Sequence, residues 1–366
     1  MNFKKTAFAT AFAAAVFASA APALAEVPAG YPANYQQLID GAKKEGKLVI
    51  YGATDSKAAQ PLIKDFNALY PGITVEYNDM NSTEVYNRFF SENAAGGDTA
   101  DVLWSSAMDL QMKLAAGGYA LQYKSPEAAK LPAWAVWKDT AYGTTFEPAA
   151  FVYNKRLLKP EEVPQTHADF VRIIQQPKFQ DKVTTYDIEK SGVGFMFMTQ
   201  DARDFAQYKQ LEQAFGAAKV RVQSSTGTML ERISSGENLI GYNVIGSYAL
   251  VRAKTDPSLG VVLPKDYTLV ISRVQFINKL SKHPNAAKLW TDYMLSHRGQ
   301  TVIANASKLF AIRADVTGET TSSELIKEIG EKNLKPLPVS PAVAEYLEPA
   351  LRLAFLKEWK ATAGKK

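Results

Sequence analysis

Residues 47–79 read KLVIYGATDSKAAQPLIKDFNALYPGITVEYND, which is a short apolar run, a longer amphipathic segment and a second extended run. The first run ends in a glycine turn, as strands often do. In the middle segment Leu62, Ile63, Phe66 and Leu69 recur at the spacing of one helix face, before a Pro-Gly stop. A strand, a helix and a strand in direct succession predict an α/β fold with parallel strand pairing.

The same alternation continues along the chain. STEVYNRFFSENAAGG and SAMDLQMKLAAGGYA have helical patterns, with the short strand DVLW between them, and a second α/β unit runs over about 154–260. Two extended stretches, TTFEPAAFVYNKRL and GVVLPKDYTLVISRVQFI, flank this second unit. We therefore expect two lobes, each a mixed sheet flanked by helices, joined by two crossing strands.

The extended stretches also set the expected boundaries. The first lobe takes residues 26–147, the second lobe takes 148–262, and residues 263–366 return to the first lobe. The segments after Pro336 are expected to pack on the first lobe as helices.

Residues 1–25, MNFKKTAFATAFAAAVFASAAPALA, have the pattern of a secretory signal peptide. Two lysines precede an Ala-rich apolar core, and Ala-Leu-Ala at 23–25 is a small-x-small cleavage site. The core is shorter than the roughly 20 residues of a membrane-spanning helix, and no cysteine follows it for lipid attachment. We expect cleavage after Ala25 and a mature protein in the periplasm.

The composition argues against several classes of protein. The formal charge of +5 includes the two signal lysines, and the remaining +3 is too small and scattered to predict nucleic-acid binding. The absence of cysteine excludes disulfides and thiol catalysis. Three histidines in unrelated segments, without a G-x-S-x-G or H-E-x-x-H pattern, argue against an exported hydrolase. We expect a monomer that is not an enzyme and has no cofactor.

Five segments are informative together, namely KLVIYGATDS, DVLWSSAMDLQ, YGTTFEPAAFVYNK, STGTMLERISSGENLIGYNVIGSYA and VVLPKDYTLVISR. In their order and spacing they resemble the extracellular solute-binding proteins of bacterial ABC importers, in the branch that includes ferric-ion binders and binders of phosphorylated small molecules. The resemblance implies a type II periplasmic-binding-protein fold that closes about a hinge on a ligand. It also implies a permease and an ATPase as partners, while a sensor subunit would share the same fold and cleft.

Ferric-ion binders of this branch use adjacent tyrosines in the second lobe. The corresponding segment here, GYNVIGSY, holds Tyr242 and Tyr248 six residues apart and has no Tyr-Tyr pair. No histidine follows the first strand in Thr54-Asp55-Ser56 either. The main hypothesis is therefore a small anionic solute, such as an organophosphate, phosphonate or carboxylate, and no metal site. A ferric-iron-binding protein is the alternative.

Ligands of open α/β sheets lie beyond the carboxyl ends of the strands, where helices begin. Helix N-termini expose unpaired N–H groups and a partial positive charge, which suit an anion. Four such turns carry small polar residues, although these residues are also the ordinary caps of any helix. The candidates from these turns are Thr54, Asp55, Ser82, Ser105, Ser106, Gly227 and Thr228.

Further candidates come from the second lobe and the crossing strands. Asp187 either binds a ligand hydroxyl or amine or caps its turn, and Tyr242 either contacts ligand or packs in the core. Arg273 lies in an apolar strand and needs a partner, either an anionic ligand held bidentately or a structural carboxylate. The remaining candidates are Thr145, Tyr186 and Ser191, with Lys57, Lys265 and Arg313 as possible cationic contacts.

Overall fold

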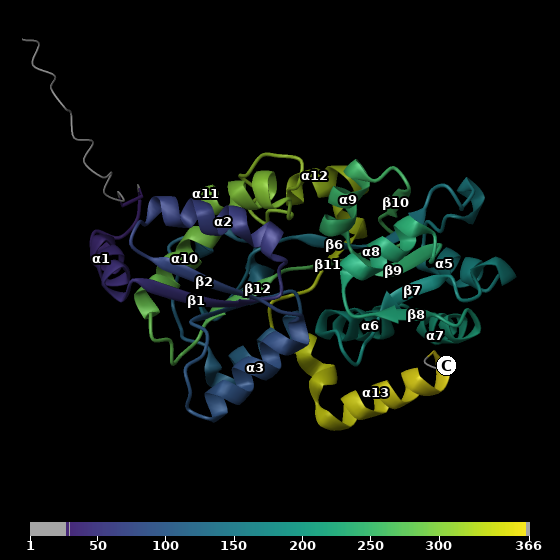
Figure 1. The fold of residues 1–366 in the computed structure, drawn as a ribbon, viewed down its shortest axis with the longest axis horizontal. Helices are drawn as coiled ribbons and strands as arrows, with labels where there is room; N and C mark the ends of the chain where they lie inside the picture. Colours follow the sequence, from purple (N-terminus) through teal and green to yellow (C-terminus); the bar gives the residue numbers. More distant parts are fainter. Residues whose placement is uncertain (1–26, 29, 364–366) are drawn as a thin grey trace, which may run out of the picture.

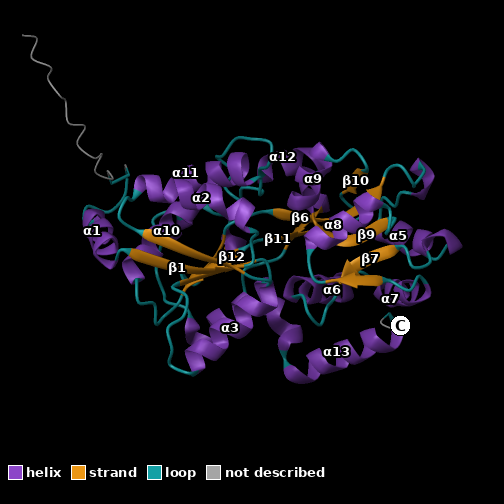
Figure 2. Ribbon diagram, viewed as in Figure 1, coloured by secondary structure: helices purple, strands orange, loops and turns teal. Residues whose placement is uncertain are grey.

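The computed structural model describes residues 27, 28 and 30–363, so the expected signal peptide lies outside the described residues. The chain forms two mixed sheets, each flanked by helices (Figures 1 and 2). The expected two-lobed α/β architecture is therefore confirmed. None of the described helices is long and apolar enough to cross a membrane.

The first sheet has the strand order β2-β1-β3-β12-β5-β4. Its strands are β1 (Lys47–Gly52), β2 (Thr74–Asp79), β3 (Val102–Ser105), β4 (Val136–Trp137), β5 (Ala141–Gly143) and β12 (Val274–Ile277). The pairs β1–β2 and β1–β3 are parallel, as predicted, and β12 is antiparallel to both β3 and β5. Parallel pairing places the carboxyl ends of β1, β2 and β3 at one edge.

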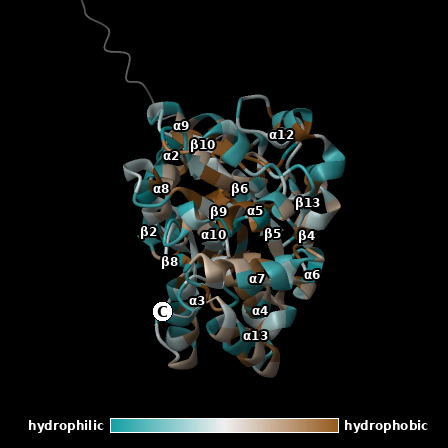
Figure 3. Cartoon of the chain, turned by 90° about the vertical axis from the view of Figure 1, so that its right-hand side faces the viewer, coloured by the Kyte–Doolittle hydropathy of each residue, from teal (hydrophilic) through white to brown (hydrophobic). Residues whose placement is uncertain are grey.

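The second sheet has the order β13-β11-β6-β9-β7-β8, and β10 also pairs with β6. Its strands are β6 (Glu147–Asn154), β7 (Val183–Tyr186), β8 (Arg221–Gln223), β9 (Ile240–Ile245), β10 (Leu259–Val262), β11 (Thr268–Ile271) and β13 (Leu334–Pro336). Viewed from the side, the apolar strands β6 and β9 lie inside a more polar layer of helices (Figure 3).

The chain passes between the sheets three times, twice through short crossings and once through the longer stretch from β12 to β13, which includes the helices over 284–329. Residues 144–146 connect β5 of the first sheet to β6 of the second, and Ser272–Arg273 connect β11 of the second sheet to β12 of the first. The two crossings are bonded to each other, because the Thr144 N–H and hydroxyl both donate to the Arg273 carbonyl, at 3.0 and 2.7 Å. The crossings are thus short and adjacent.

Helices cover both sheets and carry the two main aromatic cores. In the first lobe Phe66 packs edge-on against Trp290, with ring centroids 5.2 Å apart, and in the second Phe151 stacks on Tyr242 at 5.4 Å. The helices of the first lobe include α1 (Tyr35–Glu45), α2 (Ser56–Leu69), α3 (Ser82–Ala94), α4 (Met108–Leu114), α10 (Pro284–Leu295) and α11 (His297–Val302). The helix α12 (Ser322–Ile329) lies where the lobes meet, because its Leu325 belongs to a core cluster with residues of both sheets. Those of the second include α5 (His167–Ile174), α6 (Gly192–Asp204), α7 (Tyr208–Ala217), α8 (Thr226–Ser235) and α9 (Gly246–Thr255).

The last helix, α13 (Pro349–Thr362), departs from the expected arrangement. It lies along α6 and α7 of the second lobe rather than on the first (Figure 1). Phe355 packs against Phe195 and Trp359 against Phe215, with ring centroids 5.6 and 5.8 Å apart. The i, i+4 aromatic pair gives the helix an apolar face, but that face alone does not show which lobe covers it. The expectation that the segments after Pro336 pack on the first lobe was therefore wrong for α13, although the turn Pro341–Leu347 does contact α4 of that lobe.

Candidate functional site

A cavity of about 220 Å³ lies between the two lobes. Five helices begin at it, α2 and α3 from the first lobe and α6, α8 and α9 from the second. The residues that precede these helices all line the cavity, namely Asp55, Asn81, Ser191, Ser225 and Ile245. The cavity is therefore surrounded by the positive ends of five helix dipoles.

Side chains cap three of these helices. Asn81 accepts hydrogen bonds from the N–H groups of Thr83 and Glu84, both at 3.0 Å. Ser191 accepts from Gly194 and Ser225 from Thr228, each at 3.2 Å. Caps of this kind fix where each helix begins but satisfy only some of its first-turn donors.

The first turn of α8 has backbone N–H donors that the cap does not satisfy. In the part of the chain that the structure describes, the N–H groups of Thr226 and Gly227 have no hydrogen-bond partner. Both residues line the cavity. Unpaired N–H groups at a helix start are the usual ligands of a bound phosphate or carboxylate.

Two tyrosines and two aspartates also line the cavity. The Tyr186 hydroxyl lies 2.5 Å from the Thr226 hydroxyl, and the Tyr248 hydroxyl accepts from the Asp55 N–H at 3.1 Å. Burial raises the pKa of Tyr248 to about 12 and raises that of Tyr186 further, so both phenols are protonated at neutral pH. Asp79 accepts from the Ser56 N–H and hydroxyl at 2.7 and 2.9 Å, and burial raises the pKa of Asp55.

The two lobes touch on both sides of the cavity. Ser82 of α3 accepts a hydrogen bond from the Val193 N–H of α6 at 3.2 Å. At the other side, the Asp55–Tyr248 bond links the start of α2 to α9. Gly192 allows the close approach, because a Cβ there would lie 2.6 Å from Leu110. The structure therefore shows the lobes in contact around the cavity.

Six of the thirteen sequence-predicted residues line this cavity and seven do not. Those that line it are Asp55, Ser82, Ser106, Tyr186, Ser191 and Gly227. Those outside its lining are Thr54, Ser105, Thr145, Asp187, Thr228, Tyr242 and Arg273.

Arg273 is fully buried at the crossings and has a structural partner. Its Nε and Nη2 donate to the two carboxylate oxygens of Glu147 at 2.7 and 3.1 Å, and its Nη1 donates to the Thr54 hydroxyl at 2.9 Å. Glu147 also accepts from the hydroxyls of Thr145, at 2.9 Å, and Ser247. Of the two partners expected for Arg273, the structure therefore shows the carboxylate, and Thr54 and Thr145 belong to the same network.

Three other candidates serve local structure. Ser105 accepts from the Ala107 N–H at 3.2 Å, which fixes the turn into α4. Asp187 caps its own turn by accepting from the Glu189 N–H at 3.0 Å, the second of the two roles expected for it. The Thr228 hydroxyl lies 3.0 Å from that of Ser225, the cap of α8.

Tyr242 lies in the core of the second lobe, away from the cavity. It is buried among Phe151, Phe170 and Phe215, and its hydroxyl donates to the buried Asp201 at 3.0 Å. The strand β9 is buried along its whole length, so its side chains pack on both faces of the sheet. The core position, one of the two alternatives for this tyrosine, is the one observed.

We predict that Tyr242→Phe leaves the affinity for ligand within twofold of wild type and lowers the free energy of unfolding by about 1–3 kcal/mol, because Asp201 loses a buried hydrogen bond. Urea unfolding and calorimetry measure the two effects. Tyr248→Phe is the matched control, since its hydroxyl lines the cavity, and it should weaken binding. Equal loss of affinity in both variants would contradict the assignment of Tyr242 to the core.

Tyr248 and Asp79 are among the lining residues that the sequence analysis did not name as ligand candidates. Tyr248 lies in the first turn of α9, directly after β9, and Asp79 is the last residue of β2. Tyr248 obeys the rule used for the other turns, that lining residues follow the carboxyl end of a strand, and applying the rule after β9 would have identified it. After β2 the same rule identified Ser82 but not Asp79, which is still part of the strand.

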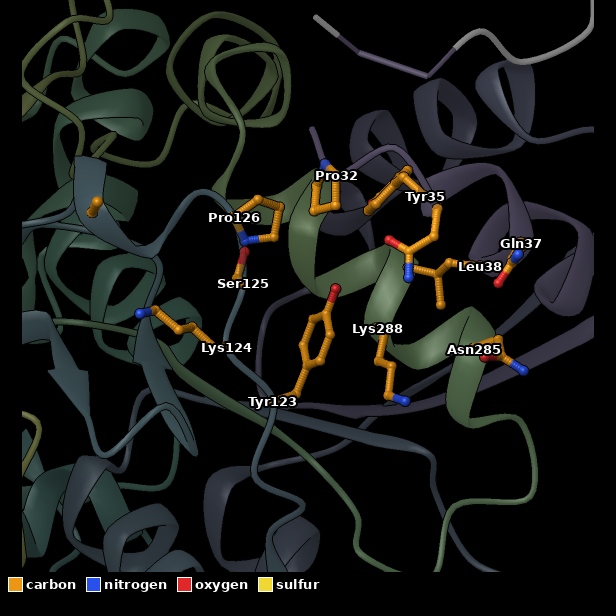
Figure 4. Close-up of a pocket in the computed structure, with 12 residues that line it drawn as sticks. Pro32, Tyr35, Gln37, Leu38, Tyr123, Lys124, Ser125, Pro126, Asn285 and Lys288 are labelled. Carbon is orange, nitrogen blue, oxygen red and sulfur yellow. The ribbon is translucent and has the colours of Figure 1, made fainter. Parts of the chain in front are cut away.

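A separate hollow of about 580 Å³ lies on the first lobe, between the start of α1 and α10 (Figure 4). Tyr123 and Lys288 lie side by side on it, with the Lys288 Nζ 5.6 Å from the ring centroid. Behind them, Asp292 accepts from the hydroxyls of Tyr35 and Tyr123 at 2.8 and 2.6 Å. This hollow contains none of the predicted site residues.

Burial raises the pKa of Asp292 to about 6, against a reference value of 3.8. The stability gained from its neutral form is fully present below pH 3.8 and is lost as the pH rises through 6. The asparagine in the Asp292→Asn variant cannot ionise, so this variant does not lose that stability. The free energy of unfolding of wild type minus that of the variant should therefore fall by about 2 kcal/mol from pH 4 to pH 7. Unfolding at both pH values measures this difference, and parallel behaviour of the two proteins would refute it.

Comparison with known proteins supports the reading of the fold. The family described as bacterial extracellular solute-binding protein matches residues 52–301. The substrate-binding protein of an ABC transporter from Agrobacterium tumefaciens is 40% identical, with a TM-score of 0.82, and the match covers 87% of this chain and 94% of that one. A search of curated proteins found no match.

Two more distant structures share the fold. The periplasmic binding protein AfuA from Actinobacillus pleuropneumoniae, solved with fructose-6-phosphate, is 18% identical with a TM-score of 0.72, over 87% of this chain and 99% of that one. Iron-bound HitA from Pseudomonas aeruginosa is 17% identical with a TM-score of 0.70, over 86% and 99%. The family match and the 40% identical structure together show that the chain belongs to the bacterial extracellular solute-binding proteins, the class that includes the substrate-binding components of ABC transporters.

Proposed function

We propose that this protein captures a small anionic, hydroxyl-bearing solute in the cavity between its lobes, in the periplasm. It then delivers the solute to the permease and ATPase of an ABC importer. The solute is an organophosphate, a phosphonate or a carboxylate. The observation that carries the proposal is the convergence of five helix N-termini on one cavity.

The helix ends supply the affinity for an anion. Unpaired N–H groups of Thr226 and Gly227 and the hydroxyls of Ser106 and Tyr186 offer neutral donors to several oxygens at once. No lysine, arginine or histidine of the described chain lines this cavity. Neutral donors at helix starts bind phosphate and carboxylate groups without a counter-ion.

The aspartates supply contacts to the rest of the solute. Asp55 and Asp79 are both on the first-lobe side of the cavity, at the start of α2 and the end of β2. A carboxylate is an acceptor for hydroxyl or ammonium groups and repels another anion. We therefore place the anionic group of the solute toward the second lobe and its hydroxyl groups toward the first.

Ferric iron is the second candidate, because the cavity contains two phenols, those of Tyr186 and Tyr248. A metal needs the deprotonated phenolate, whereas burial raises the pKa of both groups. The described residues also contain no cluster of three or more carboxylate or histidine ligands. These features favour the anionic solute over the metal.

Calorimetry distinguishes the two candidates. The purified protein is titrated with glycerol 3-phosphate, glucose 6-phosphate, an alkylphosphonate, a hydroxycarboxylate and ferric citrate, and citrate alone is the control for the last. The proposal expects saturable binding of at least one phosphorylated, phosphonate or carboxylate solute. Binding of ferric ion and of none of the organic anions would overturn it.

A further inference from the structure

The space between the lobes continues beyond the cavity into a second, larger one. This outer chamber has a volume of about 610 Å³, against 220 Å³ for the cavity. Asp55, Gly227 and Tyr248 line both spaces and form the junction between them. Both lobes contribute walls, through α2 on one side and α8 and α9 on the other. A solute too long for the cavity would therefore extend past Asp55 into this chamber.

The outer chamber differs from the cavity in its charges. Lys57, Arg252 and Lys308 line it, together with the carboxylates of Asp55 and Asp256. Arg252 already faces Asp256, with 3.6 Å between Nε and Oδ2. Within the described part of the chain, Lys57 and Lys308 have no carboxylate within ion-pair distance. Two cations from the first lobe therefore face this space without an ion pair, and the carboxylate that Lys308 interacts with at longer range, Glu319, is paired with Lys254.

A buried hydroxyl in the same wall also lacks a partner. Ser307 is 6% exposed, lines the outer chamber, and its Oγ makes no hydrogen bond to any described residue. It ends the π-helical turn Ile303–Ser307 and directly precedes Lys308. A buried polar group is rarely left unpaired, because that costs about 1–3 kcal/mol. The unpaired hydroxyl beside the cation indicates that a polar group binds at this wall.

We infer that the outer chamber is a second anion subsite, and that the solute carries two anionic groups. The inference rests on the proposed function, which places the first anionic group at the helix starts in the cavity. The second group lies near Ser307, Lys57 and Lys308. Asp55, at the junction, accepts from a hydroxyl or ammonium group on the spacer between them. The substrate class is a hydroxylated compound with an anion at each end, such as a phosphorylated sugar acid or a sugar bisphosphate.

The test compares matched pairs of solutes that differ in the second anionic group. The pairs are glycerol 3-phosphate with 3-phosphoglycerate, glucose 6-phosphate with 6-phosphogluconate, and fructose 6-phosphate with fructose 1,6-bisphosphate. Calorimetry at low ionic strength limits screening of the exposed lysines. In at least one pair the doubly anionic member should bind about tenfold tighter or better. The Lys57→Gln/Lys308→Gln variant should lose that preference while its affinity for the singly anionic member stays within twofold.

Lys64→Gln is the control, because this exposed lysine is on α2 but outside both spaces. It should keep the preference, and circular dichroism verifies that each variant is folded. Equal affinities within every pair, or a preference that survives the double lysine variant, would overturn the second subsite alone. If no member of any pair binds, the phosphorylated-solute form of the proposed function fails together with the inference.

Discussion

Gly227→Asp should abolish capture of the solute while leaving the fold intact. Gly227 lies in the first turn of α8 and lines the cavity. The nearest atom to a Cβ at this position is the Ser225 Oγ at 3.8 Å, so a side chain fits. A carboxylate there would lie among the donors that bind the anion. Repulsion between two charges about 4 Å apart at an effective dielectric constant of 20 is roughly 4 kcal/mol, so we expect the affinity to fall by at least about a hundredfold.

The Gly227→Asn variant separates charge from shape, since its side chain has nearly the same size and no charge. We expect it to bind the solute within about tenfold of wild type. The aspartate at a helix start should leave thermal stability unchanged or slightly higher. Calorimetry with the tightest solute of the panel measures both variants. If the asparagine and aspartate variants lose affinity equally, the cavity does not select for negative charge.

Arg273→Met should destabilise the protein more than any other single change considered above. It leaves the carboxylate of Glu147 fully buried with only the hydroxyls of Thr145 and Ser247 as partners. Breaking a buried ion pair from one side costs about 3–5 kcal/mol, because the remaining charge is uncompensated. Urea unfolding followed by circular dichroism measures the loss.

The Glu147→Gln/Arg273→Met double variant tests the cause. Removing both charges should recover at least half of the stability lost by the single variant, since no buried charge then lacks a counter-ion. A double variant less stable than the single would show that packing, and not charge, dominates at this site.

The fold could be predicted from the sequence to a large extent. The spacing of Leu62, Ile63 and Phe66 predicted α2, and all three are buried on the first sheet's side of that helix. The two extended stretches predicted the two short crossings between the sheets, but not the third passage, from β12 to β13. The placement of α13 could not be predicted, because Phe355 and Trp359 show that the helix has an apolar face but not which lobe provides its partner.

Of the residues that line the site, the sequence could predict mainly those at the starts of helices. A turn that follows a strand can be identified from local sequence, and this rule placed Asp55, Ser82, Ser191 and Gly227 at the cavity. Whether a polar side chain meets a ligand or another residue depends on distant partners. Glu147, which neutralises Arg273, is 126 residues away along the chain. No local pattern could distinguish this structural pairing from a ligand contact.

The short paired crossings have a mechanical consequence. We expect the two short crossings, which are bonded to each other, to form a hinge axis about which the lobes rotate. The Glu147–Arg273 pair lies near that axis, so its surroundings would change little as the lobes swing. The hydrogen bonds Ser82–Val193 and Asp55–Tyr248 join the lobes around the cavity, away from the hinge. A small rotation at the hinge would therefore separate these residues by a larger distance. Binding of a solute would then change the contacts around the cavity more than the contacts at the hinge.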